Sequence, residues 1–410
     1  MRIRPPALTA AVATTPADGT LPPQDPAPVE RRPRRVLFVF AWLVVGGEET
    51  EVRLLARHLD PARYRLEVVA CFRKPNMPEQ THEQLAALGV PVDRTPYGLS
   101  FEATIAYLAD KIAREGYDLI VACQAVPDIY PALARLATPP PLIEHGGLVD
   151  EALVGPKDRT ARYIGVCTAI RDAAAQRMPD RPQHALAIPS MVDLSEFDPV
   201  HRAAVRAEWD IAPGVPVIGW VGRLDRKKRV EDFLHAAAIL YREDPTVRFV
   251  VIGGPDAFMP EYADELYVLA DALGLGASLT FLGDRPDVPR LLSGLDAFVW
   301  LARGEGMPHV IAEAGAACLP VVATRDNGTT EQLVDEHTGL FVPYGDPAAV
   351  AAAMRRLTAD PALRHRLGAG LRSTVEREYD ATAIARRWAA LFDEVLAQAE
   401  SNRAACDKAR

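Results

Sequence analysis

The feature that most constrains this fold is an alternation of short apolar runs with amphipathic stretches, which occurs twice along the chain. Short apolar runs bounded by turn residues predict buried strands, and the longer amphipathic stretches between them predict helices. Strands that alternate with helices are typical of parallel sheets covered on both faces. An irregular, proline-punctuated segment over residues 192–216 separates the two series. The sequence therefore predicts an α/β protein with two Rossmann-like halves.

The positions of these runs set the domain boundaries that we expect. A chain of 410 residues is too long for one ordinary core and suits two domains. The first domain is predicted over residues 36–192 and the second over residues 216–375, with residues 193–215 as the linker. A helical stretch over residues 376–400 is expected to pack back on the first domain. Two α/β domains that face each other leave a cleft, where ligands commonly bind.

The first 35 residues differ from the rest of the chain. They are rich in Pro and Ala, lack apolar periodicity and end in a basic stretch from Arg31 to Arg35. A signal peptide needs an apolar segment between its charges and a cleavage site, and none is present here. The following apolar run, Val36–Val45, is far too short to span a bilayer and predicts a buried strand. We therefore expect a disordered tail over residues 1–35 and no stable membrane insertion.

The overall composition excludes several classes of partner and site. A formal charge of −9 argues against general binding to nucleic acid or to anionic membranes. The five cysteines are scattered, and no Cys or His spacing suggests a metal site, so we expect a reduced, cytoplasmic chain without a bound metal. The Gly46-Gly47 pair after the first strand lacks the spacing of a dinucleotide fingerprint, which disfavours a nicotinamide oxidoreductase.

Two carboxylates flank a predicted helix start in the second half. The stretch from Gly304 to Glu313 follows a strand, crosses a glycine-flanked loop and enters a helix in which Pro308 suits the first position. A helix start at the carboxyl end of a parallel strand offers free N–H groups to an anion. Glu305 precedes the helix and Glu313 lies more than a turn inside it, so both can accept hydrogen bonds from sugar or ribose hydroxyls. Taken alone, the two acids fit a solvated helix equally well.

A cationic segment follows another predicted strand of the second half. Gly222 has no side chain to obstruct a ligand, and Arg223 and Lys228 emerge at the same end of the sheet. Cations at this position can hold a diphosphate and stabilise the negative charge that develops as it leaves a glycosidic carbon. Arg226 and Arg229 are expected instead to lie on a solvated helix start.

Two segments of the first half are expected to form the opposite wall of the cleft. Gly46 and Gly47 follow the first strand, where they allow the backbone to approach an anion closely. His145 ends a later strand and is followed by Gly146 and Gly147, which places its imidazole at the cleft with small neighbours.

Together these segments resemble the retaining glycosyltransferases of the GT-B fold, specifically glycosyltransferase family 4, also named glycosyl transferases group 1. The resemblance extends from residue 36 to about residue 390 and is densest over residues 219–346. Its motif residues are Gly222, Arg223 and Lys228, which are similar to the phosphate-binding motif of that family, and Glu305 and Glu313, which match its Glu–seven residues–Glu motif.

The resemblance implies a role for each of these side chains. Arg223 and Lys228 would bind the diphosphate of the donor, Glu313 the ribose of its nucleotide, and Glu305 the hydroxyls of its sugar. Enzymes of this fold are generally metal-independent, and no Asp-x-Asp motif marks a manganese site here. The resemblance therefore implies no cofactor, with a nucleotide-diphosphate sugar as co-substrate and cations in the electrostatic role of a metal.

Four further residues have implied roles around the donor sugar. Gly306, Met307 and His309 would lie near the sugar and the phosphates, the last two through their backbone, and His145 would approach the sugar from the first domain. The first domain would then bind the acceptor and the second the nucleotide sugar.

The expected activity is retaining transfer of a sugar to an acceptor hydroxyl, with a small soluble metabolite or natural product as the acceptor. The leaving diphosphate is expected to receive the acceptor proton on the same face. Alternatives are a lipid-linked or polysaccharide acceptor, a GT-B nucleotide-sugar epimerase, and a catalytically silent sugar-nucleotide-binding protein. A silent protein is expected to lack Arg223, Lys228 or Glu305, and all three are present.

Overall fold

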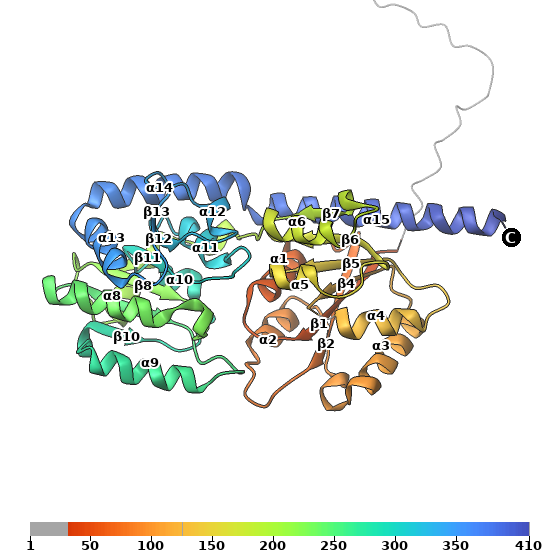
Figure 1. The fold of residues 1–410 in the computed structure, drawn as a ribbon, viewed down its shortest axis with the longest axis horizontal. Helices are drawn as coiled ribbons and strands as arrows, with labels where there is room; N and C mark the ends of the chain where they lie inside the picture. Colours follow the sequence, from red (N-terminus) through yellow and green to blue (C-terminus); the bar gives the residue numbers. More distant parts are fainter. Residues whose placement is uncertain (1–31, 125, 410) are drawn as a thin grey trace, which may run out of the picture. The chain divides into compact units, whose positions relative to one another are not determined.

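The chain folds around two parallel β-sheets in the computed structural model, which describes residues 32–124 and 126–409 (Figure 1). The first sheet has seven strands in the order β3-β2-β1-β4-β5-β6-β7, and the second has six in the order β10-β9-β8-β11-β12-β13. The paired strands within both sheets run parallel, which confirms the two α/β halves predicted from the alternation. The strands are β1 (Arg34–Trp42), β2 (Tyr64–Phe72), β3 (Val92–Asp93), β4 (Leu119–Cys123), β5 (Leu142–Gly146), β6 (Thr160–Gly165), β7 (Ala185–Ala187), β8 (Val217–Val221), β9 (Arg248–Ile252), β10 (Leu279–Phe281), β11 (Ala297–Trp300), β12 (Val321–Thr324) and β13 (Gly339–Val342).

Helices connect these strands and cover the faces of both sheets (Figure 1). Parallel neighbours require such crossovers, because a short turn cannot return the chain to the same end of the sheet. The helices are α1 (Gly47–His58), α2 (Gln80–Ala87), α3 (Phe101–Glu115), α4 (Val126–Ala134), α5 (Val149–Leu153), α6 (Thr168–Gln176), α7 (Arg202–Glu208), α8 (Val230–Glu243), α9 (Glu261–Ala272), α10 (Val288–Leu292), α11 (His309–Ala316), α12 (Thr329–Gln332), α13 (Pro347–Ala359), α14 (Pro361–Glu378) and α15 (Ala381–Ala409).

The first strand begins inside the stretch that the sequence assigned to the tail. Arg34 and Arg35 belong to β1, because the Arg34 N–H donates to the carbonyl of Arg63 and the Arg35 N–H donates to Asp118. The Arg35 guanidinium also pairs with Glu115, so the end of the basic stretch is held by acids of its own domain. The rest of the predicted tail, residues 1–31, lies outside the described residues.

The chain passes between the two halves at two adjacent points. The N–H of Val192 donates to the carbonyl of Tyr379 at 2.8 Å, and the N–H of Ala381 donates to the carbonyl of Val192 at 2.9 Å. The linker therefore lies beside the segment that leads from α14 into α15.

Helix α15 packs against the first sheet through one apolar face. Ile384, Trp388 and Phe392 lie four residues apart, which places them on the same side of the helix. They are buried in one cluster with Val36 and Phe38 of β1. This C-terminal helix therefore contributes to the core of the N-terminal half.

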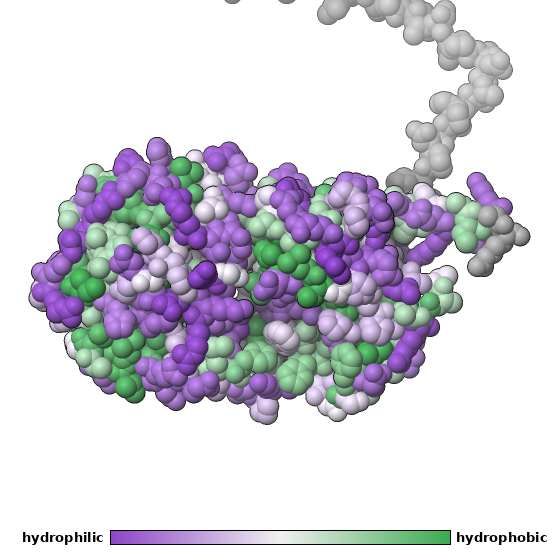
Figure 2. Space-filling model, in the orientation of Figure 1, coloured by the Kyte–Doolittle hydropathy of each residue, from purple (hydrophilic) through white to green (hydrophobic). Residues whose placement is uncertain are grey.

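The hydropathy of the surface and of the helices bears on whether the chain could insert in a membrane. Hydrophilic side chains cover most of the face drawn in Figure 2. Among the residues that the structure describes, no helix combines the length and the apolar character needed to cross a bilayer.

Candidate active site

The cationic segment of the second half starts at a close approach of two backbones. Gly222 follows β8 and has a φ of +155°, which only glycine adopts readily. A Cβ on Gly253, which follows β9, would overlap the Gly222 carbonyl. Glycine is therefore required here by the turn itself, in addition to any ligand, and Arg223 and Lys228 follow this turn in the chain.

Lys228 lies beside the predicted sugar-binding carboxylate. Its Nζ is 2.7 Å from Oε2 of Glu305 and 5.1 Å from the ring centroid of Trp300, at the end of β11. Lys228 closes a short 3-10 turn in which the Asp225 side chain accepts from the Lys227 N–H. The structure thus brings together two residues that are 77 positions apart and that the sequence assigned to one donor site.

Arg223 is held by an acid that the sequence analysis missed. Its guanidinium forms an ion pair with Asp256, which is only 2% exposed. The second oxygen of Asp256 accepts from the Phe258 N–H at 2.7 Å, so the carboxylate is fixed as well. Asp256 follows Gly253-Gly254-Pro255 after β9, and this glycine-rich strand end is the signal that could have identified it.

The loop before α11 is fixed by backbone contacts from two directions. The Glu305 N–H donates to Asp326 at 2.9 Å, and the Gly306 carbonyl accepts from the Gly328 N–H at 2.6 Å. A Cβ on Gly306 would overlap the carbonyl of Gly147, in the first half of the chain. Gly306 therefore permits a close contact between the two halves directly beside Glu305.

Helix α11 begins one residue later than predicted. Pro308 has a ψ of 118°, which is extended, so it precedes the helix and His309 is the first helical residue. The Met307 carbonyl accepts from the Ser190 hydroxyl at 3.2 Å, which holds it toward the linker. The sequence placed Met307 and His309 at the site through their backbone, but the His309 side chain also reaches the first half.

The His309 ring packs on the Gly46-Gly47 segment. Its Cδ2 lies 2.8 Å from the position that a Cβ on Gly47 would take. Burial lowers the pKa of His309 to about 4, so the ring is neutral near pH 7. Its Nδ1 is buried and lacks a hydrogen-bond partner among the described residues. A glycine at position 47 is thus required for this contact.

A carboxylate of the first turn of α1 lies beside Gly46 and Gly47, where the sequence predicts a close approach of the backbone to an anion. Helix α1 begins at Gly47, directly after Gly46. Glu49 therefore lies in its first turn, and Oε2 of Glu49 is 2.6 Å from the position of a Cβ on Gly46. Oε1 of Glu49 accepts from the Val44 N–H at 3.1 Å. The carboxyl group of Glu49 is thus held at the positive end of the helix, where negative charge is favourable.

Glu313 lies on α11, close enough to Arg53 of α1 to feel its charge. Burial raises its pKa from 4.5 to about 7, and the positive charge of Arg53 offsets part of this rise. Arg53 itself forms two hydrogen bonds with Glu196 of the linker, at 2.7 and 3.2 Å. Glu313 is therefore a partly buried carboxyl whose pKa lies near 7, whereas on a solvated helix face its pKa would stay near 4.5.

His145 ends β5 inside a group of acids and aromatic rings. Its Nδ1 lies 3.7 Å from Glu48 and its Nε2 lies 3.5 Å from Glu51, while its ring contacts the edge of Trp388 at a centroid distance of 5.4 Å. Burial lowers the pKa of His145 to about 3, so the imidazole is neutral. The sequence analysis missed these neighbours, and Trp388 is too far along the chain for any local pattern to indicate it.

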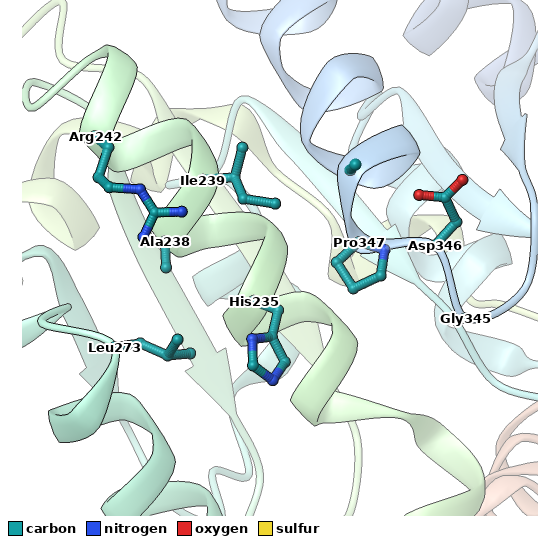
Figure 3. A pocket seen from close by; sticks show the side chains of 9 residues that line it. His235, Ala238, Ile239, Arg242, Leu273, Gly345, Asp346 and Pro347 are labelled. Carbon is teal, nitrogen blue, oxygen red and sulfur yellow. The ribbon is translucent and has the colours of Figure 1, made fainter.

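A separate hollow of about 580 Å³ lies away from all of these residues. It is lined by side chains of α8, the end of α9 and the start of α13, including His235, Arg242 and Asp346 (Figure 3). The Asp346 carboxylate already accepts from the Ala349 N–H at 2.9 Å, which caps α13. The hollow therefore contains none of the predicted site residues.

Clusters of metal-ligating side chains are the next feature of the site. Within residues 32–124 and 126–409, no group of three or more His, Cys, Asp or Glu side chains could hold a metal ion. The positive charge beside Glu305 is that of Lys228.

Several of the predicted site residues are thus brought together at the carboxyl ends of the two sheets, whereas Arg223 pairs with Asp256 instead. Lys228 pairs with Glu305, Gly306 contacts the loop after His145, and His309 packs on Gly47. These contacts join segments from both halves of the chain. Residues 201–374 match the family described as glycosyl transferases group 1. We refer to these matched residues as the group 1 segment.

The group 1 segment contains Arg223, Lys228, Glu305 and Glu313, whereas Gly46, Gly47 and His145 lie outside it. A D-inositol 3-phosphate glycosyltransferase of Nocardia farcinica is 33% identical over 185 residues, which are 44% of this chain and 41% of that protein. The lipopolysaccharide core biosynthesis glycosyltransferase LpsD of Rhizobium meliloti is 32% identical over 200 residues, which are 49% of this chain and 54% of that protein. The chain thus spans about half the length of the curated relatives it matches.

A solved structure extends the similarity over both halves. HepE of Anabaena, in complex with UDP and glucose, superimposes with a TM-score of 0.74 and 21% sequence identity. The alignment covers 87% of this chain and 99% of HepE. At this identity the likeness concerns the fold alone. It confirms the prediction of a GT-B fold with two Rossmann-like halves.

Proposed function

We propose that this chain is a retaining glycosyltransferase of family 4 that moves a sugar from a nucleotide-diphosphate donor to an acceptor hydroxyl. The observation that carries the proposal is the Lys228–Glu305 pair at the start of α11, within the group 1 segment. A cation and a carboxylate 2.7 Å apart at a helix start suit the two ends of one ligand, a diphosphate and a polyol.

In this proposal the donor lies along the carboxyl ends of β8, β9 and β11. Lys228 and Arg223 bind the diphosphate, and Asp256 holds the Arg223 guanidinium in position. Glu305 accepts from hydroxyls of the sugar and Glu313 accepts from the ribose. HepE was solved with UDP and glucose, which supports UDP-glucose as the first donor to test.

The chemical step uses the same charges. As the glycosidic bond breaks, negative charge grows on the leaving diphosphate, and Lys228 and Arg223 stabilise it more strongly than they stabilise the bound donor. The acceptor hydroxyl attacks from the face that the diphosphate leaves and passes its proton to that diphosphate, so the anomeric configuration is retained. With two cations and the α11 start supplying positive charge, this step needs neither a metal nor a cofactor.

The experiment is a thermal-shift screen followed by an activity assay. A nucleotide that binds the folded chain raises its melting temperature by mass action, so UDP, GDP, ADP and their glucose or mannose conjugates are compared directly. The best donor is then used in an assay for release of the nucleoside diphosphate, with wild type, Lys228→Ala and the control Arg226→Ala. Arg226 is exposed and pairs with Glu265, so its loss should leave donor binding intact.

The results of these assays distinguish a transferase from a catalytically silent sugar-nucleotide-binding protein and from an epimerase. Stabilisation together with nucleotide release that requires Lys228 supports the transferase. Stabilisation without turnover, even with a broad set of acceptors, would favour a sugar-nucleotide-binding protein. A donor whose sugar is inverted at one carbon without transfer would favour an epimerase. Lipid-linked and polysaccharide acceptors belong in the acceptor set, because one relative is named for lipopolysaccharide core biosynthesis.

A further inference from the structure

The loop between β9 and α9 contacts the first half of the chain through one partly exposed aromatic ring. The centroid of the Phe258 ring lies 5.3 Å from that of Trp42, with the two planes inclined at 60°. The Lys74 Nζ lies 4.4 Å from the centroid of the Phe258 ring, and the Asn76 amide donates to the Ala257 carbonyl at 3.1 Å. Figure 1 shows the loop after β2 and the loop before α9 meeting between the two halves. We name these five residues the clasp.

The part of the clasp that belongs to the first half is held by its own neighbours. Trp42 is the last residue of β1, in the interior of the first sheet. The turn that carries Lys74 is closed by the Met77 N–H, which donates to the Lys74 carbonyl at 3.2 Å. The Arg73 guanidinium donates to the Met77 carbonyl at 2.7 Å and fixes the turn further. Phe258 therefore packs on a surface whose shape does not depend on it.

The part of the clasp that belongs to the second half is tied to one carboxylate. Oδ1 of Asp256 accepts from the Phe258 N–H at 2.7 Å, and the Asp256 carbonyl accepts from the Met259 N–H at 3.2 Å. Oδ2 of Asp256 pairs with the Arg223 guanidinium. The two oxygens of this carboxylate thus join the backbone of Phe258 to the side chain of Arg223. Because Asp256 is only 2% exposed, loss of either partner would leave a buried oxygen unsatisfied.

Part of the Arg223 guanidinium remains accessible to an anion. The side chain is 30% exposed, and Asp256 is its hydrogen-bond partner among the described residues. Burial raises the pKa of Glu49 in α1, and the charge of Arg223 offsets part of this rise. The guanidinium is therefore within electrostatic reach of the first half, while its hydrogen bond is to the second.

We propose that Phe258 is a positioning residue for binding of the donor diphosphate. Its ring is fixed against Trp42 and Lys74, and its N–H fixes Asp256. Asp256 in turn orients Arg223, so the first half sets the position of a phosphate-binding side chain that belongs to the second half. A guanidinium that is already oriented loses less conformational freedom when a phosphate binds. This inference rests on the proposed function, because it concerns the diphosphate that Arg223 binds there.

The test is a double-mutant cycle with the donor and the nucleoside diphosphate (UDP, GDP or ADP) that the thermal-shift screen selects. Phe258→Ala should lower kcat/KM for the donor by about tenfold and raise the Kd of the diphosphate by about fivefold. Its melting temperature should stay close to that of wild type, since the ring is 41% exposed. In the Arg223→Ala background the same substitution should change both quantities by less than about twofold, because the side chain through which it acts is gone.

Three further variants separate the clasp from general packing. Phe258→Tyr keeps the ring and should keep both quantities within about twofold of wild type. Trp42→Leu removes the opposite ring and should reproduce the loss seen in Phe258→Ala, with little further loss when both are changed, because they act through one contact. Phe101→Ala is the matched control: Phe101 is 55% exposed at the start of α3, and its loss should leave kcat/KM and Kd unchanged.

The results also distinguish this inference from the proposed function. An equal loss from Phe258→Ala in the wild-type and Arg223→Ala backgrounds would show that the ring does not act through Arg223. Unchanged kcat/KM and Kd in Phe258→Ala would show that the clasp does not position the diphosphate site, even though transfer is intact. Wild type that neither binds a nucleotide sugar nor releases nucleotide would instead refute the proposed function on which the inference rests.

Discussion

Replacing Glu313 by glutamine should stabilise the protein at high pH and have a smaller effect at low pH. Burial raises the pKa of this carboxyl from 4.5 to about 7 in the folded chain. The folded state therefore holds the Glu313 proton at pH values where the unfolded chain has released it. The resulting cost to the fold is nearly absent below pH 4.5 and complete above pH 7. Glutamine carries no such cost at any pH.

The size of the effect follows from the same two values. A rise in pKa from 4.5 to about 7 is a change of roughly 300-fold in proton affinity, or about 3 kcal/mol. At pH 5 the unfolded carboxyl is only partly ionised, so the expected gain for Glu313→Gln is about 1 kcal/mol or less, and at pH 8 it approaches about 3 kcal/mol. Glu313 is partly exposed, so these figures are upper limits.

The assay is urea unfolding of wild type and variant at pH 5 and pH 8, followed by fluorescence. Glu83→Gln, at an exposed position of α2, is the control, and its free energy of unfolding should differ from that of wild type by the same small amount at both pH values. Equal effects of Glu313→Gln at the two pH values would mean that the carboxyl titrates normally, and the buried environment argued for it would be wrong. Because the proposed function gives this carboxylate to the ribose, the stabilised variant should also bind the nucleotide donor more weakly at pH 8.

Three further predictions concern the proposed donor site. Lys228→Ala should lower kcat/KM by about a hundredfold, with a smaller effect on the donor KM than on kcat, whereas kcat/KM of the control Arg226→Ala should stay within about twofold of wild type. Near-wild-type activity in Lys228→Ala would show that Lys228 does not bind the diphosphate. Activity should survive excess EDTA, because Lys228 and Arg223 supply the positive charge, and loss that one divalent ion restores would refute this electrostatic scheme. Glu305→Gln should slow transfer by about tenfold to a hundredfold, which corresponds to about 1.5–3 kcal/mol. The product from an α-linked donor should still be α-linked in proton NMR, and an inverted product would refute retention.

The architecture could be predicted from the sequence because it depends on local periodicity. Buried strands such as β1 and β9 each contain a continuous apolar run after their first arginines, and their existence and order follow from the chain alone. The short edge strand Val92–Asp93 escaped notice, since two residues carry no period and are defined only by pairing with β2. The linker also contains α7, whose seven residues lie among proline-rich turns.

The donor site was predictable to a similar extent, and for a similar reason. Glu305 and Lys228 stand at strand ends that the sequence identifies, and parallel strands bring their carboxyl ends to one edge. The surroundings of His145 were not predictable, because they combine residues of α1 with Trp388, near the end of the chain. The hydrogen bond from the Val44 N–H to Glu49 likewise depends on where that helix begins.

The return of the chain through Asp380 has a consequence for engineering. The core of the N-terminal half is completed by α15, and Trp388 donates to Glu51 beside His145. A chimera that exchanges only residues 36–192 with a relative would pair a foreign first sheet with the original C-terminal helix. To transplant acceptor preference, the exchanged unit has to be discontinuous, with both 36–192 and 381–409 taken from the same parent.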